Sequence, residues 1–351
     1  MKKIKTSIIG ASGYTGVELI RLLSAHPQVE LTHLVSETYQ QQELIEVFPH
    51  LAHLTHLKFV SLDLTQLAQQ SDVVFLALPH TKAAAMAKEL LQHNCKVIDL
   101  SADLRLNDGA TYEQWYQHPA ADSALLAQAV YGLAEIGYRE QIAGASLIAN
   151  PGCYPTATLL ALAPLLNNKL LNLSAAPVII DAKSGVSGAG RSLSLATHFC
   201  ETSNNFSAYQ VGGIHRHTPE IEQELGKLAG KELMVQFTPH LIPIPRGLMV
   251  TAYCPLNSSL SLKSIKQFYT EYYQDSYFVQ LNNQERTGVK AVIGTNFCQI
   301  SLHLDLRTNY LVVVSVIDNL LKGASGQAVQ NMNLMYQLPE TIGLTALAVY
   351  P

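Results

Sequence analysis

Apolar and polar residues alternate along the first 150 positions in a pattern that predicts strands followed by helices. Short apolar runs, typical of buried strands, stand between stretches with apolar residues at helical spacing, such as "VELIRLLSAH". Strands that alternate with helices predict a parallel sheet covered by helices on both faces. The predicted strands are 5–11, 29–36, 72–79, 96–101 and 146–152, and the predicted helices are 17–26 and 81–94.

The pattern changes after residue 153, where strands predominate and few helices are predicted. The segment 177–190 combines a strand with a glycine-rich loop, and three strand-rich segments follow. This order predicts a larger, partly antiparallel sheet. A helix predicted over 319–338 could return to pack on the first domain. The strand-rich segments are 233–244, 247–256 and 296–318.

Two patterns predict two domains, which agrees with a length of 351 residues. Hydrophobic residues make up 48% and charged residues 14%, enough apolar material for a sizeable core. The formal net charge of -4 includes no long run of one sign, so neither a nucleic-acid surface nor a polybasic membrane surface is indicated. With a junction at Pro151 and Gly152, we expect one domain over 1–150 and about 319–351, and another over 151–318.

The cysteines and the apolar runs favour a reducing, cytoplasmic location. Five cysteines are an odd number, and they show neither C-x-x-C nor zinc-like spacing, which argues against a disulfide framework. The basic start "MKKIKTSIIGASG" has too short an apolar run for a signal peptide. No apolar run is long enough to cross a bilayer.

The loop "GASGYTG" (10–16) predicts a nucleotide site. Its G-x-x-G-x-x-G spacing falls between the first predicted strand and the first predicted helix. Glycine lets the backbone turn tightly and approach a pyrophosphate, which the N–H groups of the helix N-terminus then bind. A glycine turn without a ligand is the alternative. The candidate cofactor contacts are Gly10, Ser12, Gly13, Tyr14, Thr15, Gly16 and Ser36.

The end of the second predicted strand leaves the choice of nucleotide open. An acidic residue there binds the ribose of NAD and repels the 2′-phosphate of NADP. Ser36 stands at this place and could donate a hydrogen bond to a phosphate. Glu37 follows it and would either oppose the phosphate or face solvent.

The segment "NPGCYPTA" (150–157) contains the candidate nucleophile. Pro155 predicts a helix start, which places Cys153 just before a helix N-terminus, where the helix dipole stabilises a thiolate. Gly152 keeps bulk away from the sulfur, so we favour Cys153 as a nucleophile over an inert cysteine. Pro164 is expected to kink or end this helix. The predicted inert cysteines are Cys95, Cys254 and Cys298, and Cys200 is undecided.

The segment "GGIHRHTPEIEQEL" (212–225) offers a partner for the thiol. His215 and His217 precede a helix start marked by Pro219. In an extended segment the two rings point to opposite sides, so one of them could reach the sulfur, and we prefer His217. A metal site is the other interpretation of H-x-H, but no third ligand is evident.

Two further segments are candidates for binding an anion. "DLSADLR" (99–105) begins at the carboxyl end of a predicted parallel strand, the edge where open α/β sheets bind ligands. Ser101 and Arg105 could hold a phosphate or carboxylate there, although a surface salt bridge is the alternative. "SGVSGAGR" (184–191) could form an anion nest or a flexible turn. Weaker cationic candidates are Arg191 and Arg246.

Taken together, these motifs make the whole chain resemble the N-acetyl-gamma-glutamyl-phosphate reductases of arginine biosynthesis. They run in order from residue 10 to about residue 333, and aspartate-semialdehyde dehydrogenase is a more distant likeness. The motifs are "GASGYTGVEL", "DLSADLR", "YGLAE", "NPGCYPTA", "SGVSGAGR", "HRHTPE", "FTPHL" with "PRG", and "DNLLKGASGQAVQNMN".

The resemblance implies a fold and a reaction. The fold is α/β, with a Rossmann-type parallel-sheet domain that binds NADP(H) and an α+β catalytic and oligomerisation domain with a mixed, largely antiparallel sheet. The reaction is the reduction by NADPH of N-acetyl-L-glutamyl 5-phosphate to the 5-semialdehyde with release of phosphate. It proceeds through a thioester on Cys153, and a histidine of "HRH" exchanges a proton with the thiohemiacetal oxygen.

The resemblance also implies roles for other residues. Ser101 and Arg105 look like phosphate contacts, and Gly13 to Gly16 would hold the pyrophosphate. A homo-oligomer, dimer or tetramer, is expected, with a small acyl phosphate and inorganic phosphate as ligands. The residues expected near the nicotinamide end are Ser184, Gly185, Ser187, Gly188 and Asn319.

Three alternatives are weighed against this interpretation. "HRHTPE" with "NPGCYPT" argues against an aspartate-semialdehyde dehydrogenase. A lysine-pathway reductase of carrier-bound aminoadipyl phosphate would need an exposed basic patch, and the sequence shows no strong basic cluster. A catalytically silent NADP-binding regulator predicts damaged motifs, whereas Cys153, His215 and His217 are all present.

Overall fold

The computed structural model describes residues 2–54 and 56–349. They divide into two compact units, and each unit contains one seven-stranded sheet. The first unit comprises Met1–Gly152 and Ala324–Thr345, and the second comprises Cys153–Gly323 and Ala346–Pro351. Among the described residues, none of the helices combines the length and the apolar character that crossing a bilayer would require.

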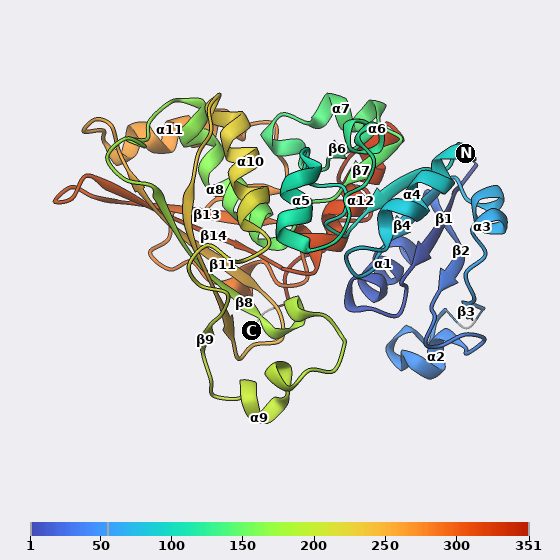
Figure 1. The fold of residues 1–351 in the computed structure, drawn as a ribbon. Coiled ribbons are helices and arrows are strands. Elements are labelled where there is room, and N and C mark those ends of the chain that lie inside the picture. Colours follow the sequence, from blue (N-terminus) through green and yellow to red (C-terminus); the bar gives the residue numbers. More distant parts are fainter. Residues whose placement is uncertain (1, 55, 350–351) are drawn as a thin grey trace. The chain divides into compact units, whose positions relative to one another are not determined.

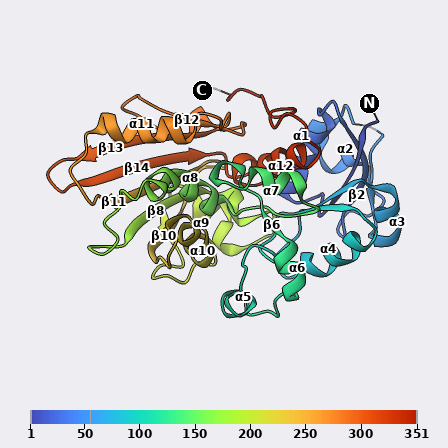
Figure 2. The same cartoon turned by 90° about the horizontal axis from the view of Figure 1, so that it is seen from above.

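The sheet of the first unit has the order β3-β2-β1-β4-β5-β7-β6, and its strands are all parallel, as predicted (Figure 1). Helices α3, α4 and α6 lie on one face, and α1, α7 and α12 lie on the other (Figure 2). The strands are β1 (Ile4–Ile9), β2 (Val29–Val35), β3 (Phe59–Val60), β4 (Val73–Leu76), β5 (Lys96–Asp99), β6 (Val130–Tyr131) and β7 (Leu147–Ala149). The helices are α1 (Tyr14–Ser24), α2 (Leu44–Val47), α3 (Leu64–Gln70), α4 (Ala83–Gln92), α5 (Gly109–Tyr116), α6 (Ser123–Gln128), α7 (Arg139–Gly144) and α12 (Gly326–Met335).

Helix α12 comes from the end of the chain and is buried along its whole length in the first unit. Its polar side chains are bonded inside the core: Asn331 Nδ2 donates to Gly132 O at 2.9 Å and to Asn150 Oδ1 at 3.0 Å. His26 Nε2 and Asn333 Oδ1 are 3.0 Å apart. The single helix predicted over 319–338 is wrong in its first part, because a π-helical turn at Leu321–Ser325 precedes α12.

The second unit is built on a mixed sheet with the order β12-β13-β14-β11-β8-β10-β9. Its pairs are antiparallel except for β8 with β10 and β12 with β13, which confirms the predicted sheet type. The segment predicted as one strand-rich run, 296–318, is a hairpin of β13 and β14. The strands are β8 (Val178–Gly185), β9 (Ser207–Ala208), β10 (Val235–Ile242), β11 (Leu248–Pro255), β12 (Val279–Leu281), β13 (Cys298–Asp305) and β14 (Tyr310–Ile317). The helices are α8 (Cys153–Asn167), α9 (Phe199–Thr202), α10 (Thr218–Ala229) and α11 (Leu262–Tyr272).

Helix α8 passes through Pro164 and continues to Asn167, so the predicted end of the helix at this proline is wrong. Proline has no N–H, which leaves the carbonyl of Leu160, four residues earlier, without its helical donor. The hydroxyl of Tyr273 donates to that carbonyl at 2.5 Å, and the hydroxyl of Tyr269 donates to Ala161 O at 2.6 Å. Tyr269 lies in the last turn of α11 and Tyr273 is its C-cap. This helix is not among those predicted from the sequence, although Ser261 caps its N-terminus.

Candidate active site

The glycine loop of the first unit contains two glycines that the fold itself requires. Gly10 has φ +84°, and a Cβ there would clash with the carbonyl of Ala77. A Cβ on Gly16 would clash with the carbonyl of Gly10. Gly13 differs, because its φ is -75° and the nearest atom to an added Cβ would be 3.6 Å away. The open space over Gly13 fits the close approach of a phosphate to the backbone.

Helix α1 begins at Tyr14, three residues before the predicted start. Gly13 is its N-cap and offers no side-chain acceptor, and its first turn carries no acidic residue. The N-terminal N–H groups therefore keep their capacity to bind an anion. Ser12 Oγ lies 2.9 Å from Ser36 Oγ, which joins the loop to the end of β2. These features fit the pyrophosphate and ribose of a dinucleotide.

The segment after β5 is held by a chain of internal hydrogen bonds. Ser101 Oγ donates to Asp99 Oδ2 at 2.9 Å and accepts from the N–H of Asp103 at 3.1 Å. Burial raises the pKa of Asp99 to about 7, and the nearby charge of Asp103 adds to the effect. The Ser101 hydroxyl, predicted as an anion contact, is therefore engaged within the chain.

Arg105 is buried, unlike a residue in a surface salt bridge. Its Nε donates to Asn150 O at 2.8 Å, and its Nη2 donates to Leu100 O at 2.8 Å. The two carbonyls fix the guanidinium at the carboxyl edge of the parallel sheet, where its charge also acts on the Asp99 carboxyl. A positive charge at this edge suits an anionic ligand.

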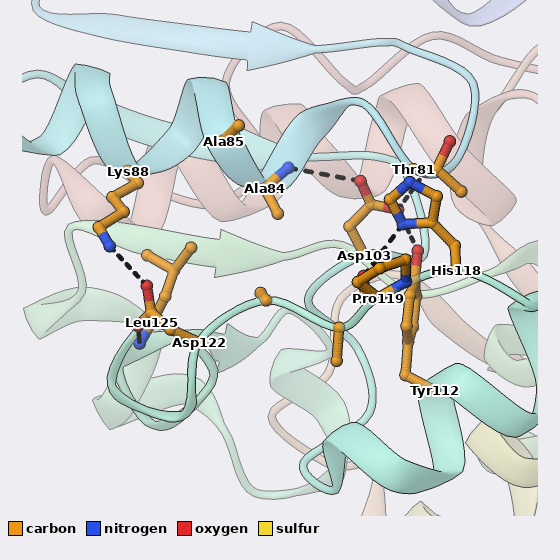
Figure 3. Close-up of a pocket in the computed structure, with 12 residues that line it drawn as sticks. Thr81, Ala84, Ala85, Lys88, Asp103, Tyr112, His118, Pro119, Asp122 and Leu125 are labelled. Atoms are coloured by element: carbon orange, nitrogen blue, oxygen red, sulfur yellow. Dashed lines mark hydrogen bonds and ion pairs between the residues drawn. The ribbon is translucent and has the colours of Figure 1, made fainter.

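A pocket of about 260 Å³ lies between α4, α5 and the loop 118–122 of the same unit (Figure 3). Its lining includes Asp103, which accepts the N–H groups of Thr81 at 2.6 Å and Ala83 at 2.8 Å and the hydroxyl of Tyr112 at 2.9 Å. Asp103 thus caps α4, whose N-terminus is already bonded to a carboxylate. The predicted site residues are not among the described residues that line this pocket.

Cys153 is the first residue of α8 and is half-buried, so the prediction of a place just before the helix is wrong by one position. Pro155 is accordingly the third helical residue. The helix dipole still favours a thiolate here, because its effect is strongest in the first turn. Burial raises the pKa of the Cys95 thiol to about 12, as expected of an inert cysteine. Cys254 and Cys298 are also buried, as predicted, and Cys200 is exposed.

His215 and His217 lie side by side in a turn, not on opposite sides of an extended segment as predicted. Their ring centroids are 5.0 Å apart, because the N–H of His217 donates to His215 Nδ1 at 3.0 Å and closes the turn. Both rings meet the ring of Tyr154 edge-on, with centroid distances of 5.6 and 6.0 Å. Tyr154 follows Cys153 in the chain, so both histidines gather around the residue next to the thiol.

The environment distinguishes the two histidines chemically. Burial lowers the pKa of His215 to about 4, and the positive charge of Arg216 adds to the effect. His215 is therefore neutral near pH 7, and because its Nδ1 accepts a backbone N–H, its proton is on Nε2. His217 is half-buried at the N-cap of α10, which begins at Thr218 as the sequence predicted.

Tyr209 belongs to the same cluster and was missed by the sequence reading. Its hydroxyl donates to Tyr154 Oη at 3.3 Å, and that of Tyr154 donates to His240 O at 3.2 Å. The pKa of Tyr209 is raised to about 12, chiefly by burial and to a smaller extent by the negative charge of the Cys153 thiolate. Tyr209 stands in "FSAYQVGG", where nothing marks it, because contacts distant in the sequence bring it to the thiol.

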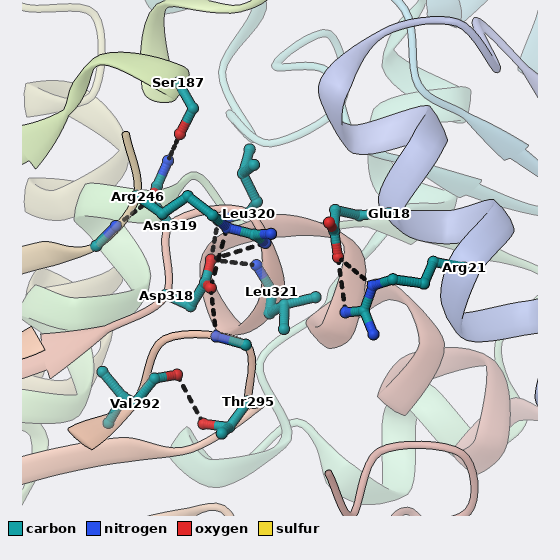
Figure 4. A network of polar contacts seen from close by, with 12 residues as sticks. Glu18, Arg21, Ser187, Arg246, Val292, Thr295, Asp318, Asn319, Leu320 and Leu321 are labelled. Atoms are coloured by element: carbon teal, nitrogen blue, oxygen red, sulfur yellow. Dashed lines mark hydrogen bonds and ion pairs between the residues drawn. The ribbon is translucent and has the colours of Figure 1, made fainter. Parts of the chain in front are cut away.

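The glycine-rich loop after β8 and Asn319 come together within the second unit (Figure 4). Asn319 Nδ2 donates to Ser187 Oγ at 2.9 Å, and Asn319 Oδ1 accepts the N–H of Gly247 at 2.7 Å. A Cβ on Gly188 would lie 2.8 Å from Ser184 Oγ. A Cβ on Gly185 would lie 2.8 Å from Ile244 O. The five residues predicted near the nicotinamide end thus form one connected group.

The two remaining arginines have different surroundings. Arg246 Nε lies 3.2 Å from Asp318 Oδ2, and its Nη2 donates to Asp318 Oδ1 at 3.3 Å. Asp318 is fully buried, so Arg246 neutralises a carboxylate inside the unit. Arg191 follows the loop and is partly exposed.

Comparison with known families defines the class of protein. Residues 5–145 match the family model described as "Semialdehyde dehydrogenase, NAD binding domain", and residues 153–319 match "Semialdehyde dehydrogenase, dimerisation domain". Aspartate semialdehyde dehydrogenase II from Vibrio cholerae has a similar fold, with a TM-score of 0.72 at 15% identity over 96% of this chain and 99% of that chain. The enzyme from Candida albicans, solved with NADP, gives a TM-score of 0.69 at 14% identity over 95% and 99%. The fold and the domain matches are those of a semialdehyde dehydrogenase, an oxidoreductase.

Curated relatives narrow the class. N-acetyl-gamma-glutamyl-phosphate reductase of Pelotomaculum thermopropionicum is 51% identical over 99% of each chain. The reductase of the same name from Desulforudis audaxviator is 50% identical over 99% of this chain and 100% of its own. The chain belongs to the N-acetyl-gamma-glutamyl-phosphate reductase family. The predicted family, enzyme class and nicotinamide dinucleotide cofactor are confirmed, and the dimerisation domain supports self-association.

Proposed function

We propose that this chain reduces N-acetyl-L-glutamyl 5-phosphate with NADPH to N-acetyl-L-glutamate 5-semialdehyde and phosphate, as a step of L-arginine biosynthesis. The observation that carries the proposal is a half-buried cysteine at the first position of α8, in a chain half identical to reductases of that name. The likeness to aspartate-semialdehyde dehydrogenases, at 14–15% identity, supports the fold alone.

The first chemical step belongs to Cys153. Its thiolate, stabilised by the N-terminus of α8, attacks the carbonyl carbon of the acyl phosphate. The C–S bond forms, the bond between the acyl carbon and the bridging phosphate oxygen breaks, and phosphate leaves with the electron pair. The product is a thioester on Cys153. We propose Arg105 and Arg191 as anion contacts. The Ser101 hydroxyl donates to Asp99 and Arg246 is bonded to Asp318, which argues against a substrate role for these two side chains.

NADPH, when bound, supplies the hydride that reduces the thioester carbonyl. The uncapped N-terminus of α1 and the Gly13 backbone would hold its pyrophosphate, and the group around Asn319 would bind the nicotinamide end. Glu37 is exposed and Ser36 is buried, which fits the alternative in which Glu37 faces solvent and leaves room for a 2′-phosphate.

His217 is the proposed acid and base. It gives a proton to the oxygen of the reduced thioester, and it takes the proton back as the C=O bond re-forms and the C–S bond breaks. The aldehyde then leaves and the thiolate is restored. His215, neutral with its pKa near 4, accepts the N–H of His217 at Nδ1 and so holds the turn that carries His217.

We further propose that the unit containing β1 to β7 binds the dinucleotide, and that the unit containing β8 to β14 carries the chemistry and self-association. Dimers or tetramers are both compatible with this proposal. The expected cytoplasmic location also stays a prediction. Light scattering at several protein concentrations would give the molar mass in solution and so distinguish a dimer from a tetramer.

The test of the proposed activity is reduction of NADP⁺ by an aldehyde in the presence of phosphate. N-acetylglutamate 5-semialdehyde is compared with aspartate semialdehyde, with and without phosphate, and NADP⁺ is compared with NAD⁺. We expect phosphate-dependent turnover of the first aldehyde, a preference for NADP⁺, and no turnover by Cys153→Ala. Faster turnover of aspartate semialdehyde, or activity in Cys153→Ala, would overturn the proposal.

A further inference from the structure

Asp318 is a fully buried carboxylate at the end of β14 whose oxygens are bonded on several sides (Figure 4). Oδ1 accepts the N–H of Leu320 at 2.9 Å and that of Leu321 at 3.2 Å. Oδ2 accepts the N–H of Gly294 at 2.8 Å, and Arg246 supplies the counter-charge at 3.2 Å. A buried carboxylate with this many donors fixes the backbone that surrounds it.

The backbone of Asp318 also begins the π-helical turn. The N–H of Gly323 donates to Asp318 O at 3.0 Å, which is the bond over five residues that defines a π turn. Single π turns inside helical segments are found frequently at functional sites. Here the turn widens the chain at Gly323, just before α12 begins.

Gly323 is packed against the cysteine. A Cβ on Gly323 would lie 2.8 Å from Cys153 Cβ and 3.3 Å from Cys153 Cα. Neither of these atoms is the end of a flexible side chain, so neither can move without moving the start of α8. The backbone of the π turn therefore packs directly against Cys153 and limits where its Cβ, and with it the sulfur, can lie.

We propose that Asp318 and Gly323 are positioning residues for the Cys153 thiolate, and that the Asp318 carboxylate holds the π turn whose Gly323 backbone supports the sulfur at the N-terminus of α8. The proposal rests on the proposed role of Cys153 as nucleophile. It assigns the Arg246–Asp318 pair to the support of the thiol. A sulfur displaced by a fraction of an ångström loses both its place against the first N–H groups of α8 and its line of attack.

The test measures the thiol directly, so it does not depend on turnover. In a Cys200→Ser background, which removes the exposed cysteine, the alkylation rate of Cys153 by iodoacetamide is measured from pH 5 to pH 10. Gly323→Ala and Asp318→Asn are compared with two controls. Gly288→Ala adds a methyl where no atom lies within 4 Å, and Asp305→Asn removes the partly exposed carboxylate paired with Arg307 at 2.8 Å.

We expect Gly323→Ala and Asp318→Asn each to slow the alkylation of Cys153 at pH 7 by about tenfold and to move the pH midpoint of this alkylation upward. In both variants kcat should fall by about 10–100-fold, while KM should stay within about twofold of the background. Both controls should match the background. A merely structural role would lower the melting temperature and leave the alkylation midpoint unchanged, and that result would overturn the proposal. If Asp318→Asn does not fold, Gly323→Ala alone decides.

The same experiment separates the two proposals. Activity that survives in Cys153→Ala would remove the nucleophile role, whereas the alkylation profiles would still report whether Asp318 and Gly323 set the state of the sulfur. Wild-type alkylation profiles in both variants, together with an inactive Cys153→Ala, would remove only the positioning role.

Discussion

The glycine loop of the first unit and the cysteine turn of the second both depend on close backbone packing, but they are built differently. In the loop, Gly16 makes room for the carbonyl of Gly10 within a short stretch of sequence, and Gly10 makes room for the carbonyl of Ala77, which follows β4. At the cysteine, Gly323 makes room for Cys153, which lies 170 positions earlier in the numbering. The glycines of the first site belong to one short motif, whereas the glycine and the cysteine of the second site come from distant segments.

This difference determines whether a substitution at each site changes function alone or function and stability together. In the loop, Gly13 is open to a ligand while its neighbours serve the fold, so binding and stability are separable by choice of residue. At the cysteine, the residues that support the thiol also stabilise the fold of the unit. Asp318, for example, is fully buried and accepts the backbone N–H groups of Gly294 and Leu320. Substitutions there are expected to affect chemistry and stability together.

The largest expected effect is that of Cys153→Ala. Removing the nucleophile should lower kcat by about 10⁴-fold or more, because no thioester can form. The dinucleotide should still bind with a Kd within about twofold of wild type, since the loop lies in the other unit. Fluorescence titration with NADPH measures the second quantity. A large loss of NADPH affinity would show that the two regions are not separable.

A smaller effect is expected from the histidines. His217→Ala should lower kcat by about 10²–10⁴-fold through loss of the proton donor. His215→Asn should retain most activity, because an amide oxygen can still accept the N–H of His217, whereas His215→Ala should lose more. The pH profile of kcat/KM checks the assignment, since a group with a pKa near 4 cannot produce a limb near neutral pH. Equal losses in His217→Ala and His215→Asn would contradict the difference in role, and a larger loss in His215→Asn would reverse the assignment.

In the glycine loop, Gly13→Ala should raise the KM for NADPH by about tenfold with little change in melting temperature, because its methyl would enter space kept for the ligand. Gly10→Ala is its matched control. At φ +84° and against the Ala77 carbonyl, it should destabilise the unit by about 2 kcal/mol or more. Thermal melts and dinucleotide titrations on both variants check the pair. A destabilised Gly13→Ala would mean that Gly13 also serves the fold.

The last effect concerns stability alone and falls on Asp99, whose pKa in the folded state is about 7 against an ordinary 3.8. A raised carboxyl pKa contributes stability that is present below about pH 4 and is lost as the pH rises through 7. Asp99→Asn stays neutral, so its free energy of unfolding relative to wild type should increase from pH 4 to pH 7 by about 1–4 kcal/mol. Urea unfolding at pH 4, 5, 6 and 7 measures the difference, and parallel curves would contradict the raised pKa.

Much of the fold was predictable because its signals are local. Alternating strands and helices predicted the parallel sheet, and the glycine loop was placed correctly after β1. The errors fall where distant residues override a local rule. Pro164 does not end α8, since the hydroxyls of Tyr269 and Tyr273 bond the carbonyls of that turn.

The candidate site was predictable as a set of residues but not as an arrangement. The residues that flank Cys153 and the two histidines in the sequence are enough to predict these three as site residues. The turn that brings the two rings together is not predictable in this way, because it depends on the N–H of His217 donating to His215 Nδ1. Tyr209 has no distinguishing neighbours in the sequence. The π turn could not be foreseen, because "NLLKGASGQAVQ" reads as an ordinary helix until the carboxylate of Asp318 and the Cβ of Cys153 are in place.

The return of α12 to the first unit has a consequence for how the protein is made. During synthesis the first 152 residues leave the ribosome long before α12, which follows about 170 residues later. At roughly 5–20 residues per second, that delay is on the order of 10–35 seconds. For that time Gly132, Asn150 and His26 lack the side-chain partners that α12 brings. Chaperones that bind nascent chains would therefore find this face of the unit open until α12 has been synthesised.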